Sequence, residues 1–224
     1  MTLPSGVRTH ANGLLWLARP DKVLEDWLDR HYVRSGGRLQ WSYKLDDHFQ
    51  ELSKLQLASL DEVYMVGKGR SLDYITSEHF PNPQAPIFCM NHSVEIIHGL
   101  GLPNPIYCCI QDLHSGVTVP PDVTIICHAE CGIDYIGHEN LFYHTKVRAG
   151  FPTSPFTVRF LKEFGVKHIT LFSFDFTANG GFRYANIEGV PVVHNIQMSK
   201  QLSDSLLKEL DGVAHTFATP QPIE

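Results

Sequence analysis

Residues 152–175, "PTSPFTVRFLKEFGVKHITLFSFD", decide the fold class. Thr153 or Ser154 suits the start of a helix with Pro155 in its first turn, and Gly165 suits the end of that helix. The run "HITLFSFD" then has the length and the β-branched and aromatic composition of a strand. A helix that leads through a glycine into an apolar strand predicts one unit of a parallel α/β sheet.

Shorter runs earlier in the chain have the same character. They are apolar without strict alternation, as expected for strands that are covered on both faces. These runs are "EVYMVG" (62–67), "PIFCMN" (86–91), "PIYCCIQD" (105–112) and "VTIICH" (123–128). Helical patterns fill gaps at 71–79, 93–99, 154–164 and 199–210. We therefore predict an α/β fold over residues 60–224, a Rossmann-like, mostly parallel sheet with helices on both faces.

Residues 1–59 differ in composition and contain all three tryptophans of the chain. After Pro20, apolar residues recur at helical spacing, namely Val23, Leu24, Trp27, Leu28 and Tyr32. A second, weaker helical pattern covers residues 46–55. The segment is therefore predicted to be an N-terminal helical cap on the catalytic domain.

The composition of the chain argues against several classes of function. The net charge of −6 gives no basic face for nonspecific binding to a polyanion. No apolar stretch of about 18 residues and no signal peptide is recognisable, so a cytoplasmic protein without a membrane partner is expected. The five cysteines suit reduced, buried thiols, and "CHAEC" (127–131) is only half of a zinc site, so no metal-ligand residue is assigned.

Polar residues end each predicted strand. Ligands of open parallel sheets bind outside the carboxyl ends of the strands, so these residues are the candidates for chemistry. The first strand enters a glycine turn in "VYMVGKGRSLDYI" (63–75), where backbone amides, the Ser71 hydroxyl and a following helix start suit phosphate oxygens. The spacing is not that of a P-loop, and Leu72 stands where a dinucleotide fingerprint needs a third glycine. The pattern favours a nucleotide monophosphate or diphosphate.

The glycine turn, "PIFCMNHS" (86–93) and "GFPTSPFTVRFLKEFGVKHITLFSFDF" (150–176) together resemble a known superfamily. One branch contains bacterial sialyltransferase-like glycosyltransferases. The other is related to the archaeal hydroxymethylpterin pyrophosphokinase and includes flagellin-modification proteins. Both have a strand that runs into Gly-Asn-Gly-Pro-Ser-Leu, a second strand that ends in Asn, and a later strand that ends in Gly-x-Asp. The resemblance spans residues 63–176, about half of the chain.

The resemblance implies a nucleotide site. Gly67, Gly69, Ser71 and Leu72 match the nucleotide-phosphate loop, whereas Lys68 and Arg70 replace the family's Asn and Pro and add cations. Asn91 matches the second-strand Asn, and Asp175 matches the acid of Gly-x-Asp, with Ser173 in place of its glycine. Thr153 and Ser154 match the helix start that faces the nucleotide in this superfamily.

Several residues are candidates for the catalytic base. In the sialyltransferase-like branch a histidine after the last strand deprotonates the acceptor hydroxyl, and His194 is best placed for that role, with His128 and His144 behind it. Asp112 is an alternative base or, with Asp175, a holder of Mg²⁺. Residues 142–152, "FYHTKVRAGFP", are interpreted as a basic, aromatic loop at the same rim.

The leading hypothesis is a transferase, namely a nucleotide-sugar-dependent glycosyltransferase. Its acceptor would be a hydroxyl of a small molecule, a protein or a hydroxymethylated DNA base, although the acidic charge does not by itself imply a nucleic acid. The rival is a pyrophosphokinase-like enzyme that uses ATP and Mg²⁺, favoured by Lys68 and Arg70. A third hypothesis is a nucleotide-binding module without catalysis, favoured by the departures from the family pattern.

Overall fold

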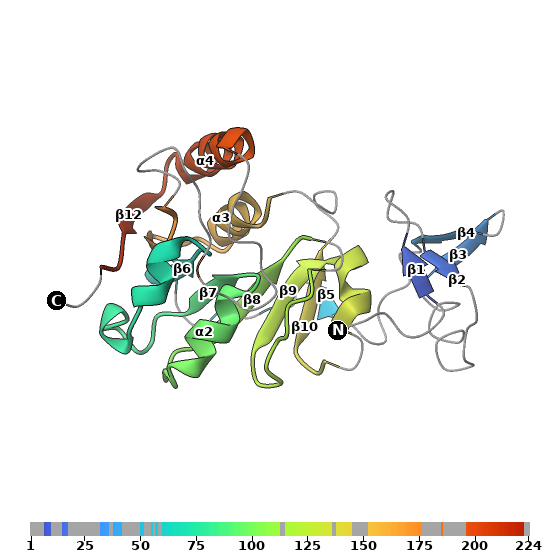
Figure 1. Ribbon diagram of the computed structural model, residues 1–224, viewed down its shortest axis with the longest axis horizontal. Coiled ribbons are helices and arrows are strands. Elements are labelled where there is room, and N and C mark those ends of the chain that lie inside the picture. Colours follow the sequence, from blue (N-terminus) through green and yellow to red (C-terminus); the bar gives the residue numbers. More distant parts are fainter. Residues whose placement is uncertain are drawn as a thin grey trace.

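The computed structural model describes residues 7–9, 15–17, 32–35, 38–41, 50–51, 55, 57, 60–112, 115–135, 138–144, 152–175, 185 and 196–221. Within these residues, an eight-stranded sheet has the order β12-β11-β6-β7-β8-β9-β10-β5, and its neighbouring strands run parallel (Figure 1). The strands are β5 (Gln50–Glu51), β6 (Glu62–Val66), β7 (Ile87–Met90), β8 (Ile106–Ile110), β9 (Thr124–His128), β10 (Leu141–His144), β11 (His168–Phe172) and β12 (Ala214–Ala218). The predicted Rossmann-like α/β fold is confirmed.

Helices cover both faces of this sheet (Figure 1). One face packs against the 3₁₀ segment η2 (Arg70–Tyr74), α2 (Ser93–Gly99) and the 3₁₀ segment η4 (Ala129–Tyr135). The other face packs against α3 (Thr153–Glu163) and α4 (Ile196–Leu210). The connections from β6 to β10 and those from β10 to β12 thus use opposite faces, as right-handed crossovers require when the strand order reverses.

Strand β6 illustrates why the strands read as continuous apolar runs. Tyr64 and Val66 face one core cluster, whereas Val63 and Met65 face the other, and all four side chains are buried. Because both faces are covered, no position of such a strand needs to be polar.

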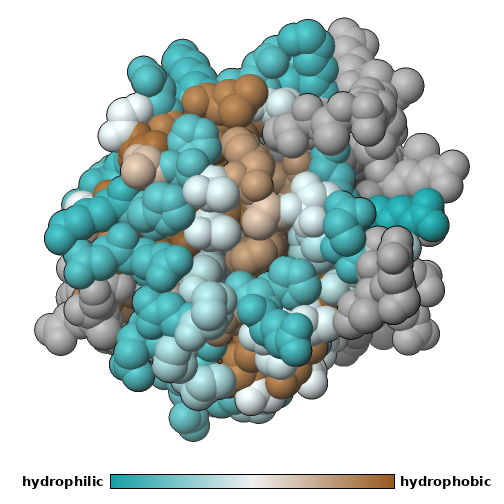
Figure 2. Space-filling model, turned by 90° about the vertical axis from the view of Figure 1, so that its left-hand side faces the viewer, coloured by the Kyte–Doolittle hydropathy of each residue, from teal (hydrophilic) through white to brown (hydrophobic). Residues whose placement is uncertain are grey.

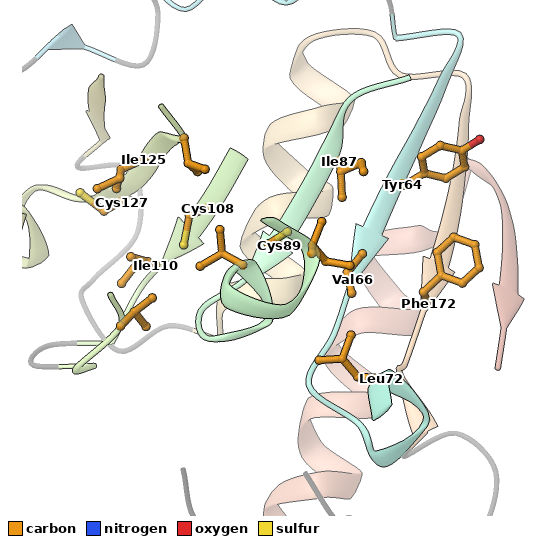
Figure 3. Close-up of a cluster of buried hydrophobic side chains, with 14 of the residues drawn as sticks. Tyr64, Val66, Leu72, Ile87, Cys89, Cys108, Ile110, Ile125, Cys127 and Phe172 are labelled. Atoms are coloured by element: carbon orange, nitrogen blue, oxygen red, sulfur yellow. The ribbon is translucent and has the colours of Figure 1, made fainter. Parts of the chain in front are cut away.

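The first core cluster contains several of the cysteines. Cys89, Cys108 and Cys127 lie among aliphatic side chains of β6 to β9 (Figure 3). All five thiols are buried and unbridged, which confirms the expectation of reduced cysteines that act as small apolar residues. Burial removes water from the thiolate form and raises the pKa of Cys109 to about 12.

The predicted helix at 71–79 is replaced by two 3₁₀ segments, η2 and η3 (Ser77–His79). Thr76 between them is extended, with φ −133° and ψ 171°. Its backbone amide donates to Nδ1 of His79 at 3.1 Å, so Thr76 starts a new turn instead of continuing the first one. The helices predicted at 93–99, 154–164 and 199–210 are present as α2, α3 and α4.

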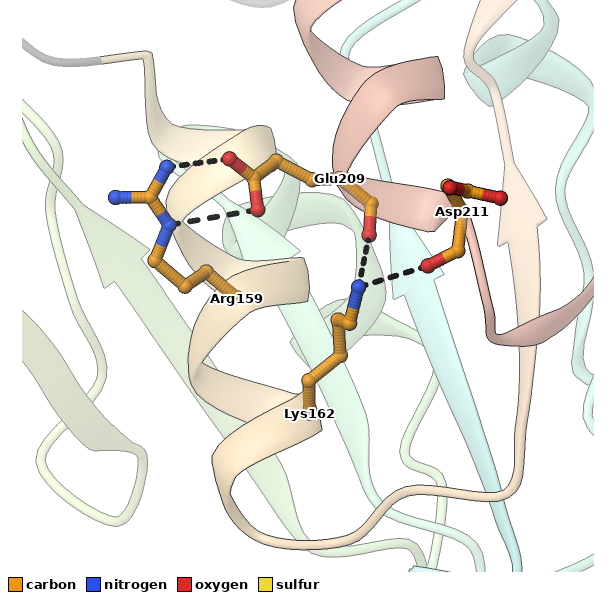
Figure 4. A network of polar contacts seen from close by, with 4 residues as sticks. All are labelled: Arg159, Lys162, Glu209 and Asp211. Carbon is orange, nitrogen blue, oxygen red and sulfur yellow. Dashed lines mark hydrogen bonds and ion pairs between the residues drawn. The ribbon is translucent and has the colours of Figure 1, made fainter.

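Ion pairing joins the two helices on the second face (Figure 4). Arg159 of α3 pairs with the carboxylate of Glu209 near the end of α4. The ammonium of Lys162 donates to the backbone oxygens of Glu209 at 3.0 Å and Asp211 at 2.8 Å. Lys162 thereby bonds carbonyls at the carboxyl end of α4, where helix carbonyls lack intrahelical partners.

Strand β12 forms one edge of the sheet and was not predicted from the sequence. Ala214, His215 and Thr216 are exposed there, and Phe217 and Ala218 are half-buried. Viewed from this side, apolar side chains form a strip flanked by hydrophilic ones (Figure 2). Because most of its side chains face solvent, this strand has neither a continuous apolar run nor a strict alternation of apolar and polar residues, and its sequence does not indicate a strand.

Apart from Leu55 and Leu57, the described residues of 1–59 lie in strands. β1 (Val7–Thr9), β2 (Leu15–Leu17), β3 (Tyr32–Ser35) and β4 (Arg38–Trp41) form an antiparallel sheet in the order β1-β2-β4-β3. The helix expected from residue 23 lies outside the described residues except for Tyr32, which begins β3. Ser35 pairs with Arg38, the register of a two-residue hairpin loop, and the intervening Gly-Gly is a sequence that such loops favour.

The predicted helix at 46–55 also differs from the structure. Gln50 and Glu51 form β5, which pairs in parallel with Phe142 and Tyr143 of β10. The large sheet therefore draws its last edge strand from the segment expected to be a cap. The pairing joins residues about ninety positions apart, and no local pattern in residues 46–55 signals it.

Candidate functional site

The strand order reverses beside β6. From β6 the chain proceeds to β7 on one side, whereas β11, its neighbour on the other side, leads to β12 at the edge. Ligands of open α/β sheets bind outside the carboxyl ends of the strands at such a switch point. Residues 67–71 follow β6 and residues 173–175 follow β11, so two segments chosen from the sequence meet at this point.

The glycine turn bonds to the end of β11. The amide of Gly67 donates to the Phe172 oxygen at 2.8 Å, and the amide of Gly69 donates to the Ser173 oxygen at 2.9 Å. Ser71 donates twice to the carboxylate of Asp175, from its amide at 2.7 Å and from its hydroxyl at 2.6 Å. These donors, which were expected to hold a phosphate, are engaged by protein oxygens in this structure.

There is no room for a side chain at Gly67 or Gly69. A Cβ atom at Gly67 would lie 2.5 Å from the Ser173 oxygen, and one at Gly69 would lie 2.5 Å from Oδ2 of Asp175. Gly69 has φ −62°, which any residue adopts, so its conformation does not demand glycine. The close approach of the β11 end explains the Gly-x-Gly pattern. The amides of Gly67 and Gly69 are thus engaged by the β11 end, whereas Lys68 is half-buried and Arg70 is exposed.

Ser173 has an unusual backbone conformation. Its φ of 59° lies in the left-handed region, which favours glycine. Ser173 occupies the position of the glycine in the Gly-x-Asp pattern, so the geometry accounts for a glycine there. The side chain is only 1% exposed, and its Oγ has no hydrogen-bond partner in the described part of the chain.

A polar cluster lies at the ends of β6, β7 and β8. Nδ2 of Asn91 donates to Oδ2 of Asp112 at 2.9 Å. Burial lowers the pKa of the Lys68 ammonium, and the nearby Asp112 carboxylate opposes that shift. Burial also lowers the pKa of His92, as does the charge of Lys68, while Asp112 acts in the opposite direction. We call Lys68, Asn91, His92 and Asp112 the polar cluster.

Several buried polar atoms at this edge of the sheet have no hydrogen-bond partner among the described residues. Buried polar groups are normally satisfied by protein, water or ligand, so an atom without a partner is unusual and marks a candidate contact point. The side chains of Asn91, Gln111 and Thr153 are 5%, 0% and 8% exposed. The atoms concerned are Asn91 Oδ1, His92 Nδ1, Gln111 Oε1, Thr153 Oγ1 and Ser173 Oγ.

A second set of polar side chains lies under the start of α3. Gln111 follows β8, and its Nε2 lies 2.6 Å from Nε2 of His144 in β10. The His144 ring stacks on Phe156 of α3 with centroids 3.8 Å apart, and it meets the His128 ring edge to face at 5.5 Å. His128 and His144 are therefore packed beneath α3 rather than at an open rim.

The predicted site residues are thus distributed over three places. Asp175 and Ser71 bond to each other, and Asn91 bonds to Asp112. Thr153 is buried and Ser154 half-buried at the start of α3, while Arg70 is exposed. His194 lies outside the described residues.

The segment 142–152, expected to be a loop, begins as a strand. Phe142 to His144 belong to β10, and Tyr143 is buried in the core. Lys146 and Arg148 lie outside the described residues. The apolar positions of "LFYH" are too few to distinguish a strand from a loop by pattern alone.

His92 and Gln111 lie at the ends of predicted strands but are not among the site residues expected from the sequence. The available signal was their position, directly after an apolar run and next to an assigned residue, Asn91 or Asp112. What identifies them in the structure is burial combined with a polar atom without a described partner.

Among the described residues, no group of three or more His, Cys, Asp or Glu is placed to hold a metal ion. None of the helices described is both long and apolar enough to cross a membrane.

Comparison of the chain with protein-family models, with curated proteins and with solved structures finds no match. The superfamily resemblance therefore rests on the quoted motifs. The described residues establish a parallel α/β sheet whose switch point is flanked by the polar cluster.

Proposed function

We propose that the chain is a nucleotide-sugar-dependent glycosyltransferase that transfers a sugar to a hydroxyl acceptor. The observation that carries this proposal is the polar cluster beside the switch point, where a half-buried lysine lies near a carboxylate, an amide and an imidazole. A transfer of this kind needs a cation for the leaving phosphate and a base for the acceptor, and the cluster offers both.

Lys68 would bind the phosphate groups of the donor, with Arg70 exposed on the same turn as a second cation. Negative charge grows on the nucleotide phosphate as its bond to the sugar breaks. A fixed ammonium in a poorly hydrated position stabilises that charge more strongly than an exposed one does. The nucleoside would extend toward Asn91 and toward Thr153 and Ser154 at the start of α3.

Asp175 receives a different role from the one first expected. Both of its carboxylate oxygens accept hydrogen bonds from Ser71, so we propose that Asp175 holds the glycine turn against β11. His194 and Asp112 remain candidates for the base. The proposed acceptor is a hydroxyl group of a small molecule, a protein or a hydroxymethylated DNA base.

The rival function is pyrophosphoryl transfer from ATP with Mg²⁺. The observation that favours it is the Asp112 carboxylate beside Lys68, because a carboxylate and a lysine commonly act together on a metal–phosphate group. Nucleotide binding without catalysis is the remaining alternative. All three proposals predict a nucleotide ligand, and they differ in which ligand is turned over.

A thermal-shift screen against UDP-, GDP-, CMP- and ADP-sugars and ATP, each with and without Mg²⁺, tests the proposal. Stabilisation grows with the ratio of ligand concentration to dissociation constant, so the preferred donor gives the largest shift. Lys68→Met should reduce the shift. Lys167→Met is the matched control, because Lys167 precedes β11 at the opposite end of the sheet and pairs with Asp61 at 2.5 Å. Stabilisation by ATP and Mg²⁺ alone would favour the rival, and no stabilisation by any nucleotide would refute the proposal.

A further inference from the structure

Two buried polar atoms lie on consecutive residues after β7. Neither Oδ1 of Asn91 nor Nδ1 of His92 has a hydrogen-bond partner in the described part of the chain. The orientation of the Asn91 amide is fixed by chemistry: an ionised carboxylate can only accept, so the NH₂ group must face Asp112 and the oxygen must face away. Asn91 therefore presents a carbonyl oxygen that needs a donor.

The needs of these atoms indicate a chemical class of ligand. An ionised phosphate brings only acceptor oxygens and cannot satisfy the Asn91 oxygen. A hydroxyl group brings a donor together with an acceptor. The atoms after β7 therefore suit a hydroxyl-bearing molecule, whereas the Lys68 ammonium, whose charge acts on His92, suits a phosphate.

We propose that Asn91 and His92 bind the acceptor hydroxyl and that His92 takes its proton during sugar transfer. This inference rests on the proposed glycosyltransferase function and names its base. The geometry that supports it is the pair of buried atoms without a described partner, Asn91 Oδ1 and His92 Nδ1, on consecutive residues, with Nδ2 of Asn91 bonded to Asp112 at 2.9 Å. The charges of Lys68 and Asp112 both act on His92.

In the proposed step, the O–H bond of the acceptor breaks and its proton passes to the imidazole of His92. The acceptor oxygen forms a bond to the anomeric carbon, and the bond from that carbon to the phosphate oxygen breaks. The electron pair of that bond leaves with the nucleotide, whose charge Lys68 stabilises. The imidazolium that forms is stabilised by the nearby Asp112 carboxylate.

The same surroundings keep His92 ready to accept a proton. Burial and the charge of Lys68 lower its pKa from the usual 6.5, and Asp112 only partly opposes them. The ring is then mostly neutral at pH 7, which is the form that a general base requires.

The first test measures nucleotide release from the preferred donor, with water as the acceptor, so that the natural acceptor need not be known. His92→Gln should lower the rate about 10²–10⁴-fold, the usual contribution of a general base. Its donor-induced thermal shift should remain. His98→Gln is the matched control, since His98 lies on α2 and bonds to the exposed Asp122 at 3.1 Å; its rate should equal that of the wild type.

The second test needs no donor. Proton NMR titration of the ring signal that is lost in His92→Gln should give a midpoint below 6.5. Lys68→Met should raise that midpoint by removing a positive charge, and Asp112→Asn should lower it by removing a negative one. These responses test the charges around His92, and the rate measurement tests its catalytic role.

The outcomes separate the inference from the proposed function. A His92→Gln variant that binds donor and turns it over at the wild-type rate overturns the inference and leaves the glycosyltransferase standing, with His194 as the next candidate. If no nucleotide sugar stabilises the wild type, the proposed function fails and the catalytic role of His92 fails with it. A midpoint at or above 6.5 that Lys68→Met does not change overturns the charge arrangement.

Discussion

Substitution of Gly69 by alanine tests whether the glycine turn is shaped by the end of β11. The added Cβ atom would lie 2.5 Å from Oδ2 of Asp175 and 2.6 Å from the Ser173 oxygen. Both distances are too short for real contacts, and one partner is backbone that cannot rotate away. The Asp175 carboxylate must therefore withdraw from Ser71.

The cost follows from the two hydrogen bonds that are lost. Each bond from Ser71 to the charged carboxylate contributes about 1.5–3 kcal/mol. Asp175 is half-buried, so water recovers part of this loss. We expect Gly69→Ala to lower the free energy of unfolding by about 2–4 kcal/mol. Urea denaturation followed by circular dichroism measures this change.

Gly99 provides the matched control. It ends α2, and a Cβ atom there would meet nothing within 4 Å. Gly99→Ala should change the free energy of unfolding by no more than about 1 kcal/mol, in the stabilising direction. A Gly69→Ala protein as stable as the wild type would refute the reasoning. In a double-mutant cycle, Asp175→Ala should cost less in the Gly69→Ala background than in the wild type, because the bonds to Ser71 are already broken.

Two further predictions concern stability away from the site. The Cys109 thiol keeps its proton in the fold but ionises near pH 9 when the chain is unfolded. Such a thiol therefore lowers the free energy of unfolding by about 1.4 kcal/mol per pH unit above 9. Urea unfolding at pH 7.5, 9 and 10 should show this loss of stability, and Cys109→Ala should reduce its dependence on pH. A double-mutant cycle of Arg159→Ala and Glu209→Ala on the free energy of unfolding should give a coupling energy of about 0.2–1 kcal/mol, because the pair is partly exposed. The coupling energy should decline in 0.5 M salt. A coupling energy that does not depend on salt would contradict an electrostatic origin.

The core strands and helices of the domain were predictable because their signals are local. A strand covered on both faces must be apolar at every position, as "EVYMV" is, and a helix start such as "TSP" is recognisable from a few residues. Short or exposed elements were not predictable. β5 has two residues and β12 is exposed, so neither carries a distinctive pattern.

For the site, the sequence identified the carboxyl-end residues but not their partners. The strand-end rule selected Gly69, Ser71, Asn91, Asp112 and Asp175 without the structure. It could not tell that Asp175 would bond to Ser71, because 104 positions separate them. Nor could it identify His92, whose role depends on burial and on charges that arrive from other strands.

The sequence by itself determined that this chain forms a parallel α/β sheet with polar residues where each central strand ends. This was possible because apolar runs and helix starts are patterns of neighbouring residues. Only the tertiary structure decided what those polar residues do. Folding places the β11 end against Gly67 and Gly69, so the turn accommodates a backbone and a carboxylate of its own chain. Folding also brings Lys68, His92 and Asp112 near one another, and the half-buried Lys68 and His92 beside the exposed Asp112 carboxylate make the cluster a candidate site.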